Sequence, residues 1–333
     1  MVQKPPTDRS WLRRKRTAVM GISLVALGSF ALGPRVRVEE RWQEPALPVD
    51  LDAYLADGER GVPALRPGSE KIVVWHDPEA PSVTPLSIVY LHGFSADRHE
   101  VEPLVSELAS DLGANVFFTR LRGHGQDGAA MGEARAEEWL DDTAEAIAIG
   151  GRIGERIVLM GTSTGGTLAV WAASRPEVRD RLAALVLVSP NLRVQDAAAP
   201  ILLWPWGGAI GRLVVGEERC FEPRSPEEAR HWTVCYPPSA LLPMMAVVRL
   251  AGSTPDGAIA VPTLVVYSKD DHVVDPEVTE RMMPRVTASP PTMFVVEGAE
   301  DPGQHVIAGA IMSPGATERV RARVRSFLEE SLP

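Results

Sequence analysis

The stretch Ile157–Gly166 (IVLMGTSTGG) constrains the fold of this chain more than any other. Four apolar residues precede the Gly-x-Ser-x-Gly pattern and a helix-forming segment follows it, which predicts a strand, a sharp turn and a helix. Gly161 and Gly165 stand where a Cβ would collide with the crossing strand and helix. Such a turn lifts the hydroxyl of Ser163 clear of the sheet, so Ser163 is a candidate nucleophile. The pentapeptide alone also fits an ordinary turn, so the choice between the two interpretations depends on the rest of the chain.

Apolar runs typical of strands alternate with helical patterns from Glu70 onward. Near-continuous apolar strands separated by helices predict a mostly parallel sheet with helices on both faces. The functional site of such a sheet lies at the carboxyl ends of its strands. The expected strands are Ile72–Trp75, Leu86–Leu91, Val116–Thr119, Ile157–Met160, Leu185–Val188, Thr263–Tyr267 and Met293–Val296, and the expected helices are Val101–Leu112, Ala134–Ile149, Gly165–Ala173, Glu277–Met283 and Thr317–Leu328.

The alternation stops between Ser189 and about Asp256, over a segment rich in Trp, Pro, Leu and Met. That interval is too long for a simple connection, and a functional lid is the usual explanation. We therefore expect residues 191–255 to form a mostly helical cap, inserted after the strand that ends near Ser189. Residues 70–190 and 256–333 would then form the core. Cys220 and Cys235 both fall in the cap, either as a disulfide or as two free thiols.

The N-terminal region divides into three parts. Residues 1–16 carry a basic cluster, residues 17–33 contain no charge, and residues 34–69 form a polar linker or arm. The uncharged run spans roughly 25 Å as a helix, slightly less than the hydrocarbon layer of a bilayer. We interpret it as a membrane anchor that leaves the catalytic domain outside the cytoplasm. The alternatives are a removed signal, which would give a secreted protein, and a buried helix.

Two backbone N–H groups are candidates for an oxyanion hole. The strand Leu86–Leu91 ends in His92-Gly93-Phe94, where a glycine lets the backbone turn toward the nucleophile. The N–H of Phe94 can then join the N–H of Thr164, which begins the helix after Ser163. Both donors would face the negative charge that forms during acyl transfer.

A serine nucleophile also needs a base and an acid in the chain order Ser, Asp, His. His305 is the histidine that follows the last core strand. Three aspartates follow the strand Thr263–Tyr267, and Asp275 is set aside because it precedes Pro276 as a helix N-cap would. Asp270 and Asp271 remain as candidates for the acid.

The other six histidines are weaker candidates for the base. His272 directly follows Asp271 in sequence, which is too close for its ring to form a hydrogen bond with that carboxylate in a useful geometry. We expect His92 and His124 to bond backbone groups in strand-end loops, and we place His76, His99 and His231 at the surface.

The chain resembles the α/β-hydrolase superfamily, in its cap-bearing branch of monoacylglycerol-lipase-like esterases and serine aminopeptidase-like hydrolases. The resemblance covers about Glu70 to Leu328 except for the cap, and it implies an α/β-hydrolase fold. In that branch the acid stands two residues before a Val-Val pair, which favours Asp271 over Asp270. The residues around His305 depart from the family pattern, with Asp301-Pro302-Gly303 in place of a Gly-His context. The motifs that carry the resemblance are Tyr90–Ser95, Arg122–Gly125, Gly161–Gly166, Asp271–Val274 and His305.

The resemblance implies a serine esterase that forms an acyl-enzyme on Ser163, with His305 as base and Asp271 as acid. A small ester with an apolar acyl group is the expected substrate. A peptidase, with Glu217, Glu218 and Glu222 as candidate ligands for an α-ammonium group, is one alternative. The others are an acyltransferase and a binding protein that has lost turnover.

Several other classes of protein do not fit the sequence. A formal charge of −10 argues against a nucleic-acid surface. The scattered histidines and the absence of a Cys-x-x-Cys pair give no metal site, and no Gly-rich dinucleotide fingerprint follows the first strand. We therefore expect no metal and no cofactor. The oligomeric state is left open.

Overall fold

The structure is a computed structural model that describes residues 15–16, 19–20, 23 and 27–332. Its main feature is a seven-stranded sheet in which every neighbouring pair is parallel except the first strand with its partner. This confirms the predicted sheet, and all seven expected strands occur with small shifts at their ends. In sheet order the strands are β1 (Ile72–Val74), β3 (Asn115–Phe118), β2 (Thr84–Leu91), β4 (Gly154–Thr162), β5 (Leu182–Val188), β8 (Thr263–Tyr267) and β9 (Thr292–Val295).

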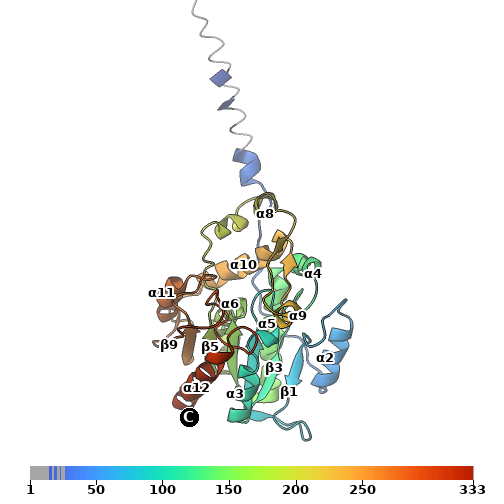
Figure 1. Ribbon diagram of the computed structural model, residues 1–333, viewed down its shortest axis with the longest axis vertical. Coiled ribbons are helices and arrows are strands. Elements are labelled where there is room, and N and C mark those ends of the chain that lie inside the picture. Colours follow the sequence, from blue (N-terminus) through green and yellow to red (C-terminus); the bar gives the residue numbers. More distant parts are fainter. Residues whose placement is uncertain (1–14, 17–18, 21–22, 24–26, 333) are drawn as a thin grey trace, which may run out of the picture.

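Helices cover both faces of the sheet (Figure 1). Side chains alternate along a strand, so Ile88 and Tyr90 of β2 enter one apolar cluster while Val89 and Leu91 enter the other. One cluster contains residues of α3 (Leu104–Leu112) and α12 (Pro314–Ser331). The opposite cluster contains residues of α5 (Ala136–Ile153), α6 (Thr164–Ala173) and α11 (Pro276–Val286).

The segment between β5 and β8 forms the cap over the core (Figure 1). Its longest helix packs against α6, the helix that follows Ser163. The cap also contains a two-stranded antiparallel sheet, closed by a disulfide between Cys220 and Cys235. Of the two states expected for the cysteines, the structure therefore has the disulfide. The elements are η2 (Ala199–Leu203), α8 (Gly207–Val215), β6 (Arg219–Cys220), α9 (Pro226–His231), β7 (Cys235–Tyr236), η3 (Pro238–Ala240) and α10 (Leu241–Gly252).

Residues 34–69 run along the core as an arm. Glu40 pairs with Arg175, and Glu44 pairs with Arg181. The arm then enters α2 (Leu51–Arg60), which buries Leu51 and Leu55 in the core cluster. Three shorter elements complete the core: η1 (Arg98–Glu100), α4 (Gly128–Glu133) and α7 (Pro176–Arg179).

The chain enters the molecule beside the cap (Figure 1). Residues 27–31 are helical, and the ring of Phe30 lies 6.4 Å from that of Trp204. The indole N–H of Trp206 donates to the carbonyl of Ser29 at 3.1 Å. Within the part of the chain that the structure describes, no helix combines the length and the apolar character needed to cross a bilayer. Most of the predicted basic segment and part of the predicted anchor, at 17–18, 21–22 and 24–26, lie outside the described residues.

Candidate active site

Ser163 occupies the sharp turn between β4 and α6, with a backbone φ of 51°. Few L-residues adopt a positive φ, and the neighbouring glycines explain why the turn can be so tight. A Cβ on Gly161 would approach the carbonyl oxygen of Gly165 to 2.5 Å, and one on Gly165 would approach that of Leu91 to 2.0 Å. The turn is fixed to the sheet because the N–H of Ser163 donates to the carbonyl of Val188 at 2.9 Å.

The structure brings Ser163, His305 and Asp271 into one chain of hydrogen bonds. His305 Nε2 lies 2.9 Å from Ser163 Oγ, and His305 Nδ1 lies 2.7 Å from Asp271 Oδ2. All three side chains are buried. With the Nδ1–H donating to the carboxylate, the lone pair of Nε2 faces the serine hydroxyl and can accept its proton.

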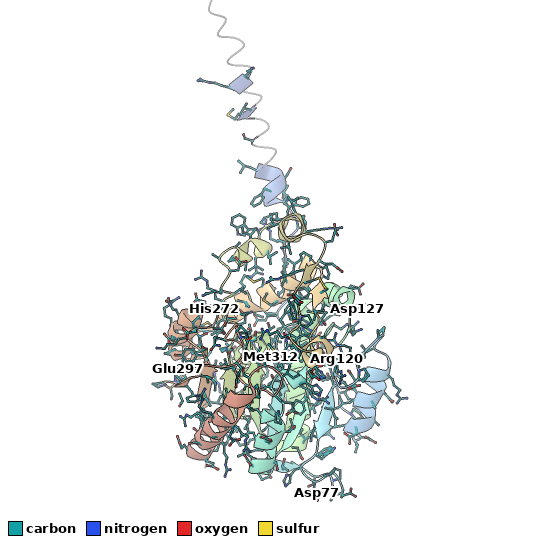
Figure 2. The ribbon with its side chains drawn as sticks, in the orientation of Figure 1. Asp77, Arg120, Asp127, His272, Glu297 and Met312 are labelled. Atoms are coloured by element: carbon teal, nitrogen blue, oxygen red, sulfur yellow. A yellow bond between two sulfur atoms is a disulfide. The ribbon has the colours of Figure 1, made fainter. Side chains whose placement is uncertain are left out.

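Only one of the two candidate acids reaches the histidine. Asp271 is buried, and its second oxygen, Oδ1, accepts the backbone N–H groups of Val273 and Val274 at 2.8 and 2.9 Å. Asp270 is exposed. Asp275 accepts the N–H groups of Glu277 and Val278, which confirms its predicted role as a helix N-cap. Figure 2 labels His272, the residue after Asp271, below the cap.

The loop that carries His305 is organised by Asp301, in the part that departs from the family pattern. Asp301 Oδ2 accepts the N–H groups of His305 and Val306 at 3.0 and 2.9 Å. Its Oδ1 accepts the N–H of Gly303 and pairs with Arg224 of the cap at 2.9 Å. Burial alone would raise the pKa of Asp301, but these donors lower it below its ordinary value. Asp301 is thus a charged anchor for the loop.

The pKa of His305 depends on the carboxylates near its ring. Burial lowers its pKa, but the hydrogen bond and the charge of Asp271 outweigh burial, so the pKa of His305 is raised above its ordinary value. The more distant carboxylate of Asp301 acts in the same direction. The site therefore favours the imidazolium that forms when the histidine takes a proton.

The two expected oxyanion donors come from the loop after β2, which carries Phe94, and from Thr164, the residue after Ser163. Among the described residues, neither the N–H of Phe94 nor that of Thr164 has a hydrogen-bond acceptor. Thr164 is the first residue of α6, whose N-terminal N–H groups have no partner within the helix. The Phe94 ring packs edge-on against Tyr236 of the cap, with centroids 5.2 Å apart.

His92 and His124 are structural, as predicted. His92 Nδ1 lies 2.8 Å from the carbonyl of Gly93, and its Nε2 accepts the N–H of Leu121 at 3.0 Å. His124 Nδ1 lies 3.3 Å from the carbonyl of Arg122. Burial lowers the pKa of both rings, so both are neutral at physiological pH.

The surface placement of His231 was wrong, because this histidine is buried against the loop after β2. Asp97 Oδ2 lies 3.0 Å from His231 Nδ1, and Asp97 Oδ1 lies 2.9 Å from His99 Nδ1. Within the described parts of the chain, these three groups alone have the spacing of metal ligands. However, the imidazoles stack at 3.9 Å and each faces a different carboxylate oxygen. The cluster therefore needs no ion, and it joins the cap to the core.

Sequence reasoning missed one buried carboxyl beside the site. Glu100 is 3% exposed, and its Oε1 accepts the N–H of Gly93 at 2.5 Å. In the sequence Glu100 looks like a solvated charge near the start of a helix. Only the turn of the loop after β2 places it behind Gly93.

Known proteins share sequence and fold with this chain. Residues 88–320 match the family model described as the Alpha/beta hydrolase family. A thermostable monoacylglycerol lipase from Bacillus sp. (strain H-257) is 26% identical over 196 residues, which are 58% of this chain and 73% of the relative.

Solved structures share the fold. One comes from a study of the metagenome-derived lipolytic enzymes LipS and LipT, with a TM-score of 0.60 and 21% identity over 80% of this chain and 99% of that one. Another is a soluble variant of the monoglyceride lipase from Saccharomyces cerevisiae, with a TM-score of 0.60 and 14% identity over 79% and 91%.

Proposed function

The chain belongs to the alpha/beta hydrolase family, and from this premise we propose that it is a serine esterase that cleaves carboxylic esters through an acyl-enzyme on Ser163. The observation that carries the proposal is the buried chain of hydrogen bonds from Ser163 through His305 to Asp271. A serine hydroxyl becomes nucleophilic when an oriented base accepts its proton, and this chain supplies both the base and its orientation.

The reaction proceeds in two halves. Ser163 Oγ attacks the carbonyl carbon of the ester while His305 Nε2 accepts the hydroxyl proton, and Asp271 stabilises the imidazolium. The N–H groups of Phe94 and Thr164 hold the oxyanion, and each such donor stabilises the transition state by about 3 kcal/mol. The imidazolium then protonates the leaving alcohol. Water, activated by His305, releases the acid and restores Ser163.

An apolar acyl ester is the substrate class that we propose. The named relatives include lipases of monoacylglycerols, and the cap presents apolar and aromatic residues next to the core. The peptidase alternative has less support, because Glu217, Glu218 and Glu222 are exposed and Glu217 already pairs with Arg212. Acyl transfer would use the same residues with an alcohol in place of water.

The substrate proposal is tested by hydrolysis of p-nitrophenyl esters from acetate to long acyl chains. We expect turnover with an optimum at a medium or long chain, and no turnover by Ser163→Ala or His305→Ala. If wild type hydrolyses amides of N-terminal residues faster than any ester, the peptidase replaces the esterase. Turnover of no ester and no amide by a protein with a reactive Ser163 would favour acyl transfer.

We also propose that residues 17–33 anchor the protein in a membrane, with the catalytic domain on the non-cytoplasmic side. The support is a group of exposed apolar side chains on this segment and on the neighbouring cap, which suit contact with a membrane. They are Leu32, Trp204, Trp206, Leu213 and Val214. The disulfide of the cap also suits an oxidising compartment.

Extraction of membranes from expressing cells tests the anchor. The full chain should stay in the membrane fraction at high salt and alkaline pH, whereas a variant that begins at Arg35 should be released. A mature N-terminus near Pro34 would contradict the anchor and favour a removed signal.

A further inference from the structure

Glu100 holds the loop that carries one of the oxyanion donors. The residue ends η1, and its Oε1 accepts the N–H of Gly93 at 2.5 Å and the hydroxyl of Tyr90 at 2.8 Å. The Tyr90 hydroxyl also lies 2.8 Å from the hydroxyl of Thr162. Gly93 directly precedes Phe94, so the carboxyl fixes the peptide that leads into the donor. Thr162 directly precedes Ser163, so the same contacts join both sides of the oxyanion hole.

The other oxygen of this carboxyl also faces Gly93. A Cβ built on Gly93 would lie 2.8 Å from Glu100 Oε2 and 3.3 Å from the Cβ of Ser163. The carboxyl and the nucleophile therefore flank the same small space at Gly93. In the described parts of the chain Oε2 makes no hydrogen bond with the protein, so Oε1 alone accepts the N–H of Gly93 and the hydroxyl of Tyr90.

The surroundings of Glu100 favour its neutral form. Burial raises the pKa of Glu100 to about 8, even though the N–H of Gly93, the hydroxyl of Tyr90 and the nearby His305 all lower it. The charge of Asp97, on the same loop, adds to the increase. The remaining groups around the carboxyl, from Tyr90 on β2 and Thr162 on β4, are uncharged hydroxyls. Burial thus favours the neutral acid over the carboxylate at this position.

We propose that Glu100 is a positioning residue that holds the oxyanion loop as a neutral acid, and that its ionisation slows acylation of Ser163 at alkaline pH. The inference rests on the proposed function. The physical reason is that the transition state of acylation carries a new negative charge on the substrate oxygen. A second negative charge on the far side of Gly93 repels it.

Glu100→Gln separates charge from shape. The amide oxygen can accept the hydrogen bonds of Gly93 and Tyr90, but the side chain cannot ionise. Glu102→Gln is a matched control, because Glu102 lies two residues away and its carboxylate accepts, among the described residues, only the N–H and hydroxyl of Ser106.

The experiment measures the rate of covalent inactivation by a fluorophosphonate, together with kcat/KM for a p-nitrophenyl ester, from pH 6 to 10. We expect wild type and Glu102→Gln to lose about tenfold in both rates above an apparent pKa near 8. Glu100→Gln should match wild type at pH 7 and keep its rate to pH 10. Fluorophosphonate reacts with the serine without ester turnover, so a wrong substrate class leaves this test intact.

Three kinetic results would overturn the proposal. They are a wild type whose rates do not fall above pH 8, a Glu100→Gln variant that keeps the fall, and a Glu100→Gln variant that is slow at every pH.

The infrared band of a protonated carboxylic acid, present in wild type at pH 6.5 and lost by pH 9.5, reports the ionisation of Glu100 without reference to activity. If that band is absent from wild type at pH 6.5, the proposal fails even where the variant does not fold. If no fluorophosphonate reacts at any pH, the serine hydrolase itself is wrong and this inference falls with it.

Discussion

Asp301 Oδ2 accepts a hydrogen bond from the backbone N–H of His305 at 3.0 Å. Through this contact a carboxylate outside the Ser163, His305 and Asp271 chain sets the position of His305, the proposed base. The same side chain accepts the N–H groups of Gly303 and Val306 and pairs with Arg224 of the cap. In the loop that departs from the family pattern, Asp301 therefore holds the backbone around His305 through these hydrogen bonds.

We expect Asp301→Ala to lower kcat/KM by about 10- to 100-fold, because three N–H groups of the loop lose their acceptor, and an unsatisfied buried donor such as that of His305 costs about 1–3 kcal/mol. Steady-state hydrolysis of p-nitrophenyl butyrate measures the loss. Asp270→Ala, on an exposed side chain, is the control and should stay within twofold of wild type. A fully active Asp301→Ala would mean that the loop needs no anchor.

Replacing each of the two adjacent aspartates in turn with asparagine tests which of them is the acid. Asp271→Asn should lose about 10⁴-fold in kcat, since an amide favours the wrong tautomer of His305. Asp270→Asn should change kcat little. The comparison uses the same ester at pH 8 for both variants, and equal effects would remove Asp271 from its assigned role.

Activity should fall on the acid side with a midpoint above pH 6.5, because the pKa of His305 is raised and only the neutral ring can accept a proton. The stability effect has the opposite sign. A raised folded-state pKa stabilises the fold fully below the unfolded pKa, and this contribution is lost as the pH rises through the folded value. A pH profile of kcat/KM measures the first effect. Chemical denaturation of wild type beside His305→Gln at pH 5.5 and 8.5 measures the second. An activity midpoint below pH 6 would contradict the account.

Removal of the cap disulfide should destabilise the cap more than the core. Cys220 and Cys235 close a loop with a sequence separation of 15, for which the chain-entropy model gives about 3 kcal/mol. Limited proteolysis of Cys220→Ser/Cys235→Ser should cut between residues 216 and 236 at a rate well above that of wild type. Equal rates of cleavage would show that packing alone holds the hairpin.

The strands and the main helices could be predicted from the sequence because their signals are local. Each core strand is a continuous apolar run, and Asp275-Pro276 marks a helix start within two residues. The choice between Asp270 and Asp271 needed the family resemblance, since both lie in the loop after the same strand. Their difference is burial, which depends on the loop of His305 folding over one of them.

The features that the sequence did not predict depend on contacts between distant segments. The burial of His231 requires Asp97, 134 residues earlier, to meet the cap. The cap hairpin has only two residues in each strand, which is too short for any alternation to be visible. Glu100 has a polar neighbourhood in sequence and acquires its buried one only when the loop after β2 folds back onto Gly93.

The most direct test of the central claim is labelling of the full chain with a fluorophosphonate, followed by mass spectrometry of its peptides. The account predicts one adduct on Ser163, none in Ser163→Ala, and labelling of His305→Ala slowed by about 10³-fold or more, because that variant lacks the base. An adduct on another residue, or labelling of His305→Ala at the wild-type rate, would contradict the assignment of Ser163 and His305.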